Sequence, residues 1–458
     1  MESKPAEFPV APADRLSVLV GSNGRLIASV FLGLPAALAT YFALRSFTLV
    51  TTQTSVLPIG DIYVFYRDYF WYLDGRYSLW QLLGSHNEHL ISTTRLALVI
   101  DTAWFGASGK FAVMVAFVLV FVTSLMLAYL AATPNKWERT GLALVFFGLG
   151  CSAIQLDNLS LPFQLGFFFV HAFALATLIA LWRGLEGDRR WYVVAFACDF
   201  VATFSLGSGV LLGVACLTIP LFTRRFDRWF ALFLGFHLLL VLLYVALVET
   251  HSGAAFSAAT ARRMVAYFLA FLGNFAVEWP KWTIPVGAAI ATVCAGLFAW
   301  LTWRALFGGI KYGKEAVLAA FAGFVILEAM AASVDRAHLG VDQALSLKYT
   351  TCTLLLVAAL FAFAWRTAPR TAPRLAALAI LGTVLFAANS REFVNGWRER
   401  NRAMDAILAE INDGKIPPGA TAYLGIDPAI FAIVISRMRE SQLGPFRATN
   451  SADSKRDG

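Results

Sequence analysis

The chain has 458 residues and a formal net charge of +8, and 59% of its residues are hydrophobic. Only 14% of the residues are charged, against about 25% in a typical soluble domain, so they could not build a water-soluble surface. This composition indicates a polytopic membrane protein, and it excludes a nucleic-acid-binding module, a disordered chain and a disulfide-stapled secreted domain.

Eleven stretches are apolar and long enough to cross a hydrocarbon layer as helices. They cover residues 25–48, 94–131, 140–156, 162–182, 191–206, 208–222, 229–248, 283–303, 316–332, 349–365 and 375–390. Lys and Arg gather in every second loop, which places the N-terminus in the cytoplasm and the C-terminus outside it. We therefore expect residues 1–390 to form an all-α transmembrane helical bundle, with the first span retained as an anchor.

The stretch 264–280 is also apolar, but a further crossing there would break the alternation of basic loops. Its flanks carry Arg262, Arg263, Glu278 and Trp279, which suit the headgroup depth. We expect an interfacial or re-entrant helix on the outer side of the membrane.

Three outer segments are long or polar: 49–93, 333–348 and the C-terminal tail 391–458. In the tail we expect a helix over 391–412, a short strand over 420–424 and a helix over 428–441. The tail would then be a small extracytoplasmic unit of α/β type, ending in disordered residues.

Charged groups in the first outer segment are the leading functional candidates, because polar groups near membrane depth are costly to keep. Asp61 follows a Pro-Ile-Gly break directly after the first span, and Arg67 and Asp68 lie in the aromatic run behind it. An aromatic belt at the interface explains the Phe, Tyr and Trp residues of this run, but it does not explain Asp61.

The stretch that leads into the second span holds Asn87, Glu88, His89 and Arg95. If 87–101 is helical, Glu88 and Arg95 share a face, with His89 beside them. This cluster could supply a base or a phosphate clamp, or it could be an ion pair that only orients the helix. Asp61, Asp68 and Glu88 could bind a divalent cation or simply pair with Arg67 and Arg95.

Two later segments add candidate binding groups. Asn158 and Gln164 flank Pro162, where their amides could bind a sugar or satisfy a turn. Arg336, Lys348 and Tyr349 lie on the outer side, where topology does not require cations, so they could hold a lipid phosphate or merely anchor to headgroups.

Single His and Cys residues inside the spans have a simpler interpretation. His171 and His237 stand alone in apolar stretches, and we expect them to be satisfied core residues. The five cysteines lack the short spacings of a zinc or redox motif, so we expect core residues there as well.

Four segments carry a family resemblance: NEHLISTTRLALVIDTAWFG, NLSLPFQLGFFF, SLGSGVL and DRAHLGVDQALSLKYTT. Together with the long acidic loop after the first span, they resemble the GT-C class of membrane glycosyltransferases. More narrowly, they are similar to a bacterial group often found with surface-polysaccharide genes. The resemblance extends over most of residues 25–390, although this chain has Leu90 and Lys348 where the group commonly has Arg.

The resemblance implies a GT-C-like fold and an enzyme of the bacterial inner membrane. Its donor would be a polyprenyl-phosphate-linked sugar and its acceptor a glycan or lipid at the outer surface. Asp61 would act as base or substrate anchor, with inversion at the sugar carbon. Arg336, Lys348 and Arg95 would then stabilise the departing phosphate.

Three other functions stay open. A transporter or flippase of a lipid-linked solute would bind a similar ligand, but no internal repeat is seen and charge collects in the outer loops rather than mid-span. A polymerase or ligase of whole glycan blocks would need a large late outer loop. A structural membrane protein without chemistry is the third alternative.

Overall fold

The protein is described by a computed structural model over residues 31–86, 89–132, 134–248, 258–308, 312–368 and 371–447. Within these ranges the regular secondary structure is helical apart from one two-stranded antiparallel ladder, β1 (Ser85–His86) with β2 (His89–Leu90). This confirms the all-α prediction. The expectations for the N-terminal residues, for Asn87 and Glu88, and for the disordered end of the tail fall outside the described residues.

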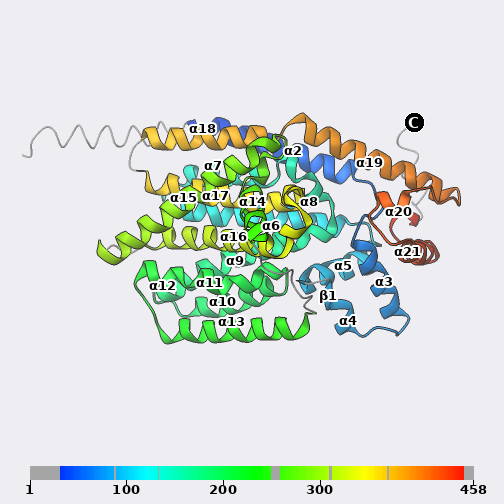
Figure 1. Cartoon of the computed structure of the whole chain (residues 1–458), viewed down its shortest axis with the longest axis horizontal. Coiled ribbons are helices and arrows are strands. Elements are labelled where there is room, and N and C mark those ends of the chain that lie inside the picture. Colours follow the sequence, from blue (N-terminus) through cyan, green and yellow to red (C-terminus); the bar gives the residue numbers. More distant parts are fainter. Residues whose placement is uncertain are drawn as a thin grey trace, which may run out of the picture.

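Long helices run back and forth along the molecule, side by side, to form the bundle (Figure 1). They are α2 (Gly33–Gln53), α6 (Lys110–Ala131), α7 (Lys136–Gly150), α9 (Leu165–Leu185), α10 (Arg190–Thr203), α13 (Arg228–Leu247), α15 (Pro280–Phe307), α16 (Lys314–Arg336), α17 (Thr350–Thr367) and α18 (Thr371–Ala387). Short pieces complete the series: α8 (Leu156–Ser160), α11 (Leu212–Cys216) and α12 (Thr218–Thr223).

Eight helices in the described residues are long and apolar enough to cross a membrane, or nine if the bent pair α7 and α8 counts as one span. The chain is therefore a multi-pass membrane protein. Helix α10 has 14 residues, and Gly207–Thr223 is also shorter than a full crossing. The expected total of eleven crossings stays a prediction.

The stretch 264–280 forms α14 (Ala258–Leu272) and a short 3-10 turn, and it is not among the eight candidate spans. Tyr244, near the end of α13, accepts a hydrogen bond from Leu90 N of the ladder. After α14, Asn274 donates to the carbonyls of Ala344 and Ser346. The C-terminal end of α13 and the N-terminal end of α15 therefore lie at the same end of the bundle. An interfacial or re-entrant helix between them requires this arrangement.

The predicted span 94–131 is wrong as one unit. It divides into α5 (Ser92–Phe105) and α6, with the chain turning through three residues of positive φ, Gly106, Ala107 and Gly109. The Asp101 carboxylate accepts from Gly109 N at 2.8 Å and Phe111 N at 2.9 Å, and so satisfies donors at the start of α6. An apolar run does not show such a break, because both helices are apolar.

The C-terminal tail packs on the first outer segment at one end of the bundle (Figure 1). Helices α3 (Ile62–Leu73) and α4 (Leu79–Leu83) share a core with α19 (Arg391–Asn412) and α21 (Pro428–Glu440). Two hydrogen bonds join the first outer segment to the tail: Gly60 N donates to the backbone carbonyl of Leu424, and Ser55 N donates to the side-chain Oδ1 of Asn401. The two predicted tail helices are confirmed.

The predicted strand at 420–424 is wrong. These residues form the single helical turn α20 (Ala420–Tyr423), enclosed by Gly419 and Gly425, both at positive φ. Five residues are too few for apolar periodicity to separate a strand from a turn of helix. The described part of the tail is therefore all helical and not of α/β type.

We expect Gly287→Ala to destabilise the protein, because α14 and α15 cross with only a glycine hydrogen between their backbones. A methyl group at Gly287 would lie 1.8 Å from Leu269 O, a backbone atom that cannot move aside. The cost should be about 1–3 kcal/mol of unfolding free energy. Gly296→Ala is the control on the same helix, with no atom within 4 Å. Equal melting temperatures of the two variants in detergent would contradict this packing.

Candidate functional site

A cavity of about 380 Å³ lies where the ladder, the ends of several helices and the late outer segment meet. Its walls combine charged and polar groups with apolar ones. The polar lining comprises Asp61, His86, His89, Gln164, Glu328, Asp335, Arg336, Lys348 and Tyr349, and the apolar lining includes Ile91, Phe163, Phe167, Leu206, Leu211 and Phe271. The cavity thus offers a ligand both charged groups and apolar surface.

Six of the predicted site residues meet in this cavity, and they come from four distant parts of the sequence. They are Asp61, His89, Gln164, Arg336, Lys348 and Tyr349. The structure therefore brings together one carboxylate and two permanent cations, as the sequence-based hypothesis requires.

Asp61 is held at the start of α3 by local backbone geometry. Gly60, at φ +65°, turns the chain into the helix, and the Asp61 side chain does not cap it. Its carboxylate lies 3.4 Å from His86 Nε2, and 57% of the side chain is exposed. The contact with His86 holds the pKa of Asp61 below its usual value, burial opposes this shift, and the charges of Lys348 and Arg336 add to it.

Arg336, the last residue of α16, is clamped by three neighbours. Nη2 donates to His89 Nε2 at 3.1 Å, Nη1 donates to Tyr349 Oη at 3.2 Å, and Nε lies 3.2 Å from Asp335 Oδ2. Because a guanidinium only donates, His89 Nε2 accepts here and carries no proton. The planar fork is therefore fixed in orientation at the cavity wall.

The ladder places two histidines next to each other. His86 and His89 are directly paired across β1 and β2, so their side chains leave the same face. His89 was a predicted site residue and His86 was not, although the His-x-x-His spacing was a usable signal. The predicted helix over 87–101 is wrong at residues 89–91, because His89 and Leu90 form β2 and α5 begins at Ser92. Since Glu88 lies outside the described residues, a face shared by Glu88 and Arg95 stays a prediction.

The Gly-rich segment 205–209 serves close packing in this site. A methyl group at Gly207 would lie 2.5 Å from His89 Nδ1, so the absent side chain makes room for the imidazole. Gly207 and Ser208 also line the cavity.

Four described residues that were predicted to bind substrate do not line the cavity: Arg67, Asp68, Arg95 and Asn158. Asp68 pairs with Arg67 at 2.7 Å and with Arg95 at 3.2 Å, and Arg95 Nη1 donates to Leu82 O at 2.8 Å. Asp68 is 4% exposed and Arg95 is 1% exposed. This buried cluster joins α3, α4 and α5. The Asp68 carboxylate is therefore paired with Arg67 and Arg95, which was the alternative to binding a divalent cation.

Asn158 is likewise turned away from the cavity. Its Nδ2 lies within hydrogen-bonding distance of Gln155 Oε1 at 2.8 Å and Leu347 O at 2.9 Å. Asn158 thus ties α8 to the chain beside Lys348. Its role is to position the late outer segment, while Gln164 remains the lining amide.

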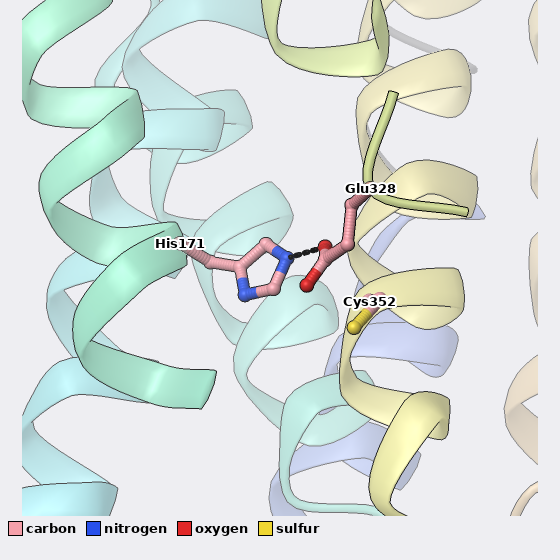
Figure 2. A group of neighbouring side chains, drawn as sticks. All are labelled: His171, Glu328 and Cys352. Carbon is pink, nitrogen blue, oxygen red and sulfur yellow. Dashed lines mark hydrogen bonds and ion pairs between the residues drawn. The ribbon is translucent and has the colours of Figure 1, made fainter. Parts of the chain in front are cut away.

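Glu328 lines the cavity and also belongs to a buried group with His171 and Cys352 (Figure 2). His171 Nε2 lies 2.9 Å from Glu328 Oε2. His237 is similarly paired with Asp199 at 2.9 Å. Both histidines are satisfied, as expected, but neither stands alone. All five cysteines are buried and unpaired by disulfides.

A second cavity, of about 470 Å³, adjoins the first and shares Phe163 with it. It lies between the first outer segment, the start of α6 and the tail helix α19. Its polar lining includes Thr54, Ser108, Lys110, Arg400 and Asn401.

Comparison of the chain with protein-family models, with curated proteins and with solved structures finds no match in any of the three.

We expect Asp68→Ala to destabilise the fold strongly, since it leaves the Arg95 guanidinium buried without its carboxylate. Breaking a buried pair in this way costs about 3–5 kcal/mol. Glu186→Gln is the control, because Glu186 pairs with Arg183 at an exposed site and should contribute about 0–1 kcal/mol. Thermal unfolding in detergent measures both, and a wild-type melting temperature for Asp68→Ala would argue against the structural role.

Proposed function

We propose that this protein is an integral membrane glycosyltransferase that moves a sugar from a polyprenyl-phosphate donor to a glycan or lipid acceptor. One observation carries the proposal: Asp61, Arg336 and Lys348 line a single cavity, together with the carboxylates Glu328 and Asp335 and an apolar part of the wall. A carboxylate in one cavity with two cations matches a reaction in which one oxygen loses a proton while another gains negative charge.

The cations suit the donor phosphate. The Arg336 fork is already oriented by His89 and Tyr349, and Lys348 Nζ lies 5.2 Å from the centre of the Tyr349 ring. A guanidinium and an ammonium together can bind phosphate oxygens and stabilise the charge that grows on them. The apolar walls would take the first part of the prenyl chain.

Asp61 suits the acceptor. As the acceptor oxygen bonds to the sugar carbon, the bond from that carbon to the phosphate oxygen breaks and the phosphate leaves with the electron pair. The acceptor proton passes to the Asp61 carboxylate. An Asp carboxylate is ionised at neutral pH, and the contact with His86 lowers the pKa of Asp61 further, so the group can accept a proton without prior deprotonation. A single displacement of this kind inverts the sugar carbon.

The reaction would take place on the outer face of a bacterial inner membrane, where the donor must arrive attached to a lipid. The basic loops favour a cytoplasmic N-terminus and an extracytoplasmic C-terminus. In support, the first outer segment and the tail pack together at one end of the bundle.

A transporter or flippase of a lipid-linked solute is the second candidate, and one observation favours it. The pairs His171–Glu328 and Asp199–His237 place ionisable groups inside the bundle, where transporters often keep them. The two candidates differ in a simple way. A transferase works in detergent, whereas a transporter needs a sealed membrane.

We expect Asp61→Asn to lower sugar transfer from a polyprenyl-phosphate donor by about 10²–10⁴-fold, because the amide cannot accept the acceptor proton. Purified protein in detergent with a radiolabelled donor gives the rate. Asp74→Asn is the control, an acidic residue of the same outer segment that does not line the cavity. Wild-type transfer by Asp61→Asn, with an unchanged melting temperature, would reject Asp61 as the base.

The acid limb of kcat/KM should move to higher pH in His86→Ala. The contact with His86 is the largest cause of the lowered pKa of Asp61, so removing the imidazole should raise the pKa of Asp61. Because the proposed reaction needs Asp61 deprotonated, the loss of activity by protonation should then begin at a higher pH. His338→Ala, an exposed histidine outside the cavity, should leave the limb in place. An unmoved limb in His86→Ala would mean that another group controls it.

A further inference from the structure

We propose that His171, Glu328 and Cys352 form a binding site for a thiophilic divalent transition metal of the Zn²⁺ type, which borders the cavity through Glu328. Figure 2 shows the three side chains converging from separate helices, α9, α16 and α17. Among the described residues, this is the one group of three or more His, Cys, Asp or Glu side chains with the spacing of metal ligands.

The ligand atoms are close enough for one ion. His171 Nε2 is 2.9 Å from Glu328 Oε2, and the ligand atoms of all three residues lie within 4.8 Å of one another. Around a tetrahedral Zn²⁺, ligand atoms at the usual bond lengths stand about 3.3–3.6 Å apart. Small side-chain rotations therefore suffice to close the site.

The histidine is held in the tautomer that a metal needs. Its Nδ1 lies 2.7 Å from the Phe167 carbonyl, to which it donates, so a neutral imidazole presents the Nε2 lone pair to Glu328. A backbone carbonyl behind a ligating imidazole is the usual outer support of such sites. Without a metal, His171 Nε2 and Glu328 Oε2 would face each other as two acceptors. Their separation of 2.9 Å then requires a proton shared between them.

The charges also fit a buried ion. A neutral imidazole, a carboxylate and a thiolate balance a divalent cation to zero net charge, which suits a site where all three residues are buried. A thiolate with an imidazole selects Zn²⁺ and similar ions over Mg²⁺ or Ca²⁺, which prefer oxygen. With three protein ligands, a fourth position stays open, and Glu328 borders the cavity that supplies access to it.

The position of the ion gives it a structural consequence. Glu328 lies two helical turns before Arg336 on α16, and Cys352 lies one turn after Lys348 at the start of α17. An ion that ties α16 to α17 and α9 would fix the separation of the two cavity cations. The inference goes beyond the proposed glycosyl transfer and does not depend on it.

Metal content tests the site directly. We would express the full chain without a polyhistidine tag in zinc-supplemented medium, purify it in detergent, dialyse it and measure zinc by mass spectrometry. We expect about one Zn²⁺ per chain. Cys352→Ser should lower affinity by at least about 10–100-fold and reduce the content to below about one tenth. Cys216→Ser, another fully buried cysteine outside the group, should retain the ion.

Cobalt gives a second readout, and its first result needs only wild-type protein. Wild-type protein loaded with Co²⁺ should show a thiolate-to-cobalt charge-transfer band, which Cys216→Ser keeps and Cys352→Ser loses. Zinc below one tenth per wild-type chain, or no such band with wild-type protein, would overturn the proposal. Equal zinc in wild type and Cys352→Ser would also overturn it. Because neither readout involves sugar transfer, failure here is distinguishable from failure of the proposed function.

Discussion

A charge taken out of water into an apolar bundle costs several kcal/mol unless a partner meets it, and this constraint governs how the helices are arranged. Glu138 accepts from Trp365 Nε1 at 2.6 Å and lies 3.7 Å from Arg374. Asp199 meets His237 from another helix. Because the partners stand on different helices, each pair fixes the position of one helix against another.

The same constraint explains why the cavity lies at the helix ends. Gln164 precedes α9, Arg336 ends α16 and Lys348 precedes α17, so their polar groups share one end of the bundle, while the charged groups inside the spans, such as Glu328 and Asp199, are paired. A ligand with a phosphate head and a hydrocarbon tail matches that division. A transferase and a transporter would both use it, and the proposal of glycosyl transfer rests on Asp61 lining the same cavity as Arg336 and Lys348.

Much of the candidate site could be predicted from sequence, because charged residues beside apolar spans are rare and costly. Asp61, His89, Arg336 and Lys348 were found in this way and do line one cavity. The assignment of Arg95 to phosphate binding was not supported, since a single sequence cannot tell a cation that faces a ligand from one buried against Asp68. His86 was missed because its position in the site depends on the pairing with His89 across the ladder.

Composition and hydropathy alone determined that this chain is a helical, multi-pass membrane protein with polar segments at 49–93, 333–348 and 391–458. These properties depend on local residue type, and local residue type is what a sequence displays. Tertiary structure decided the break between α5 and α6, the helical turn at Ala420–Tyr423 and the meeting of His171 with Glu328 and Cys352. The first two depend on local backbone geometry, such as the positive φ angles of Gly106, Gly109, Gly419 and Gly425, which hydropathy does not display. The third depends on contacts between residues far apart in the chain, and the free energy of such contacts is not encoded in any one segment.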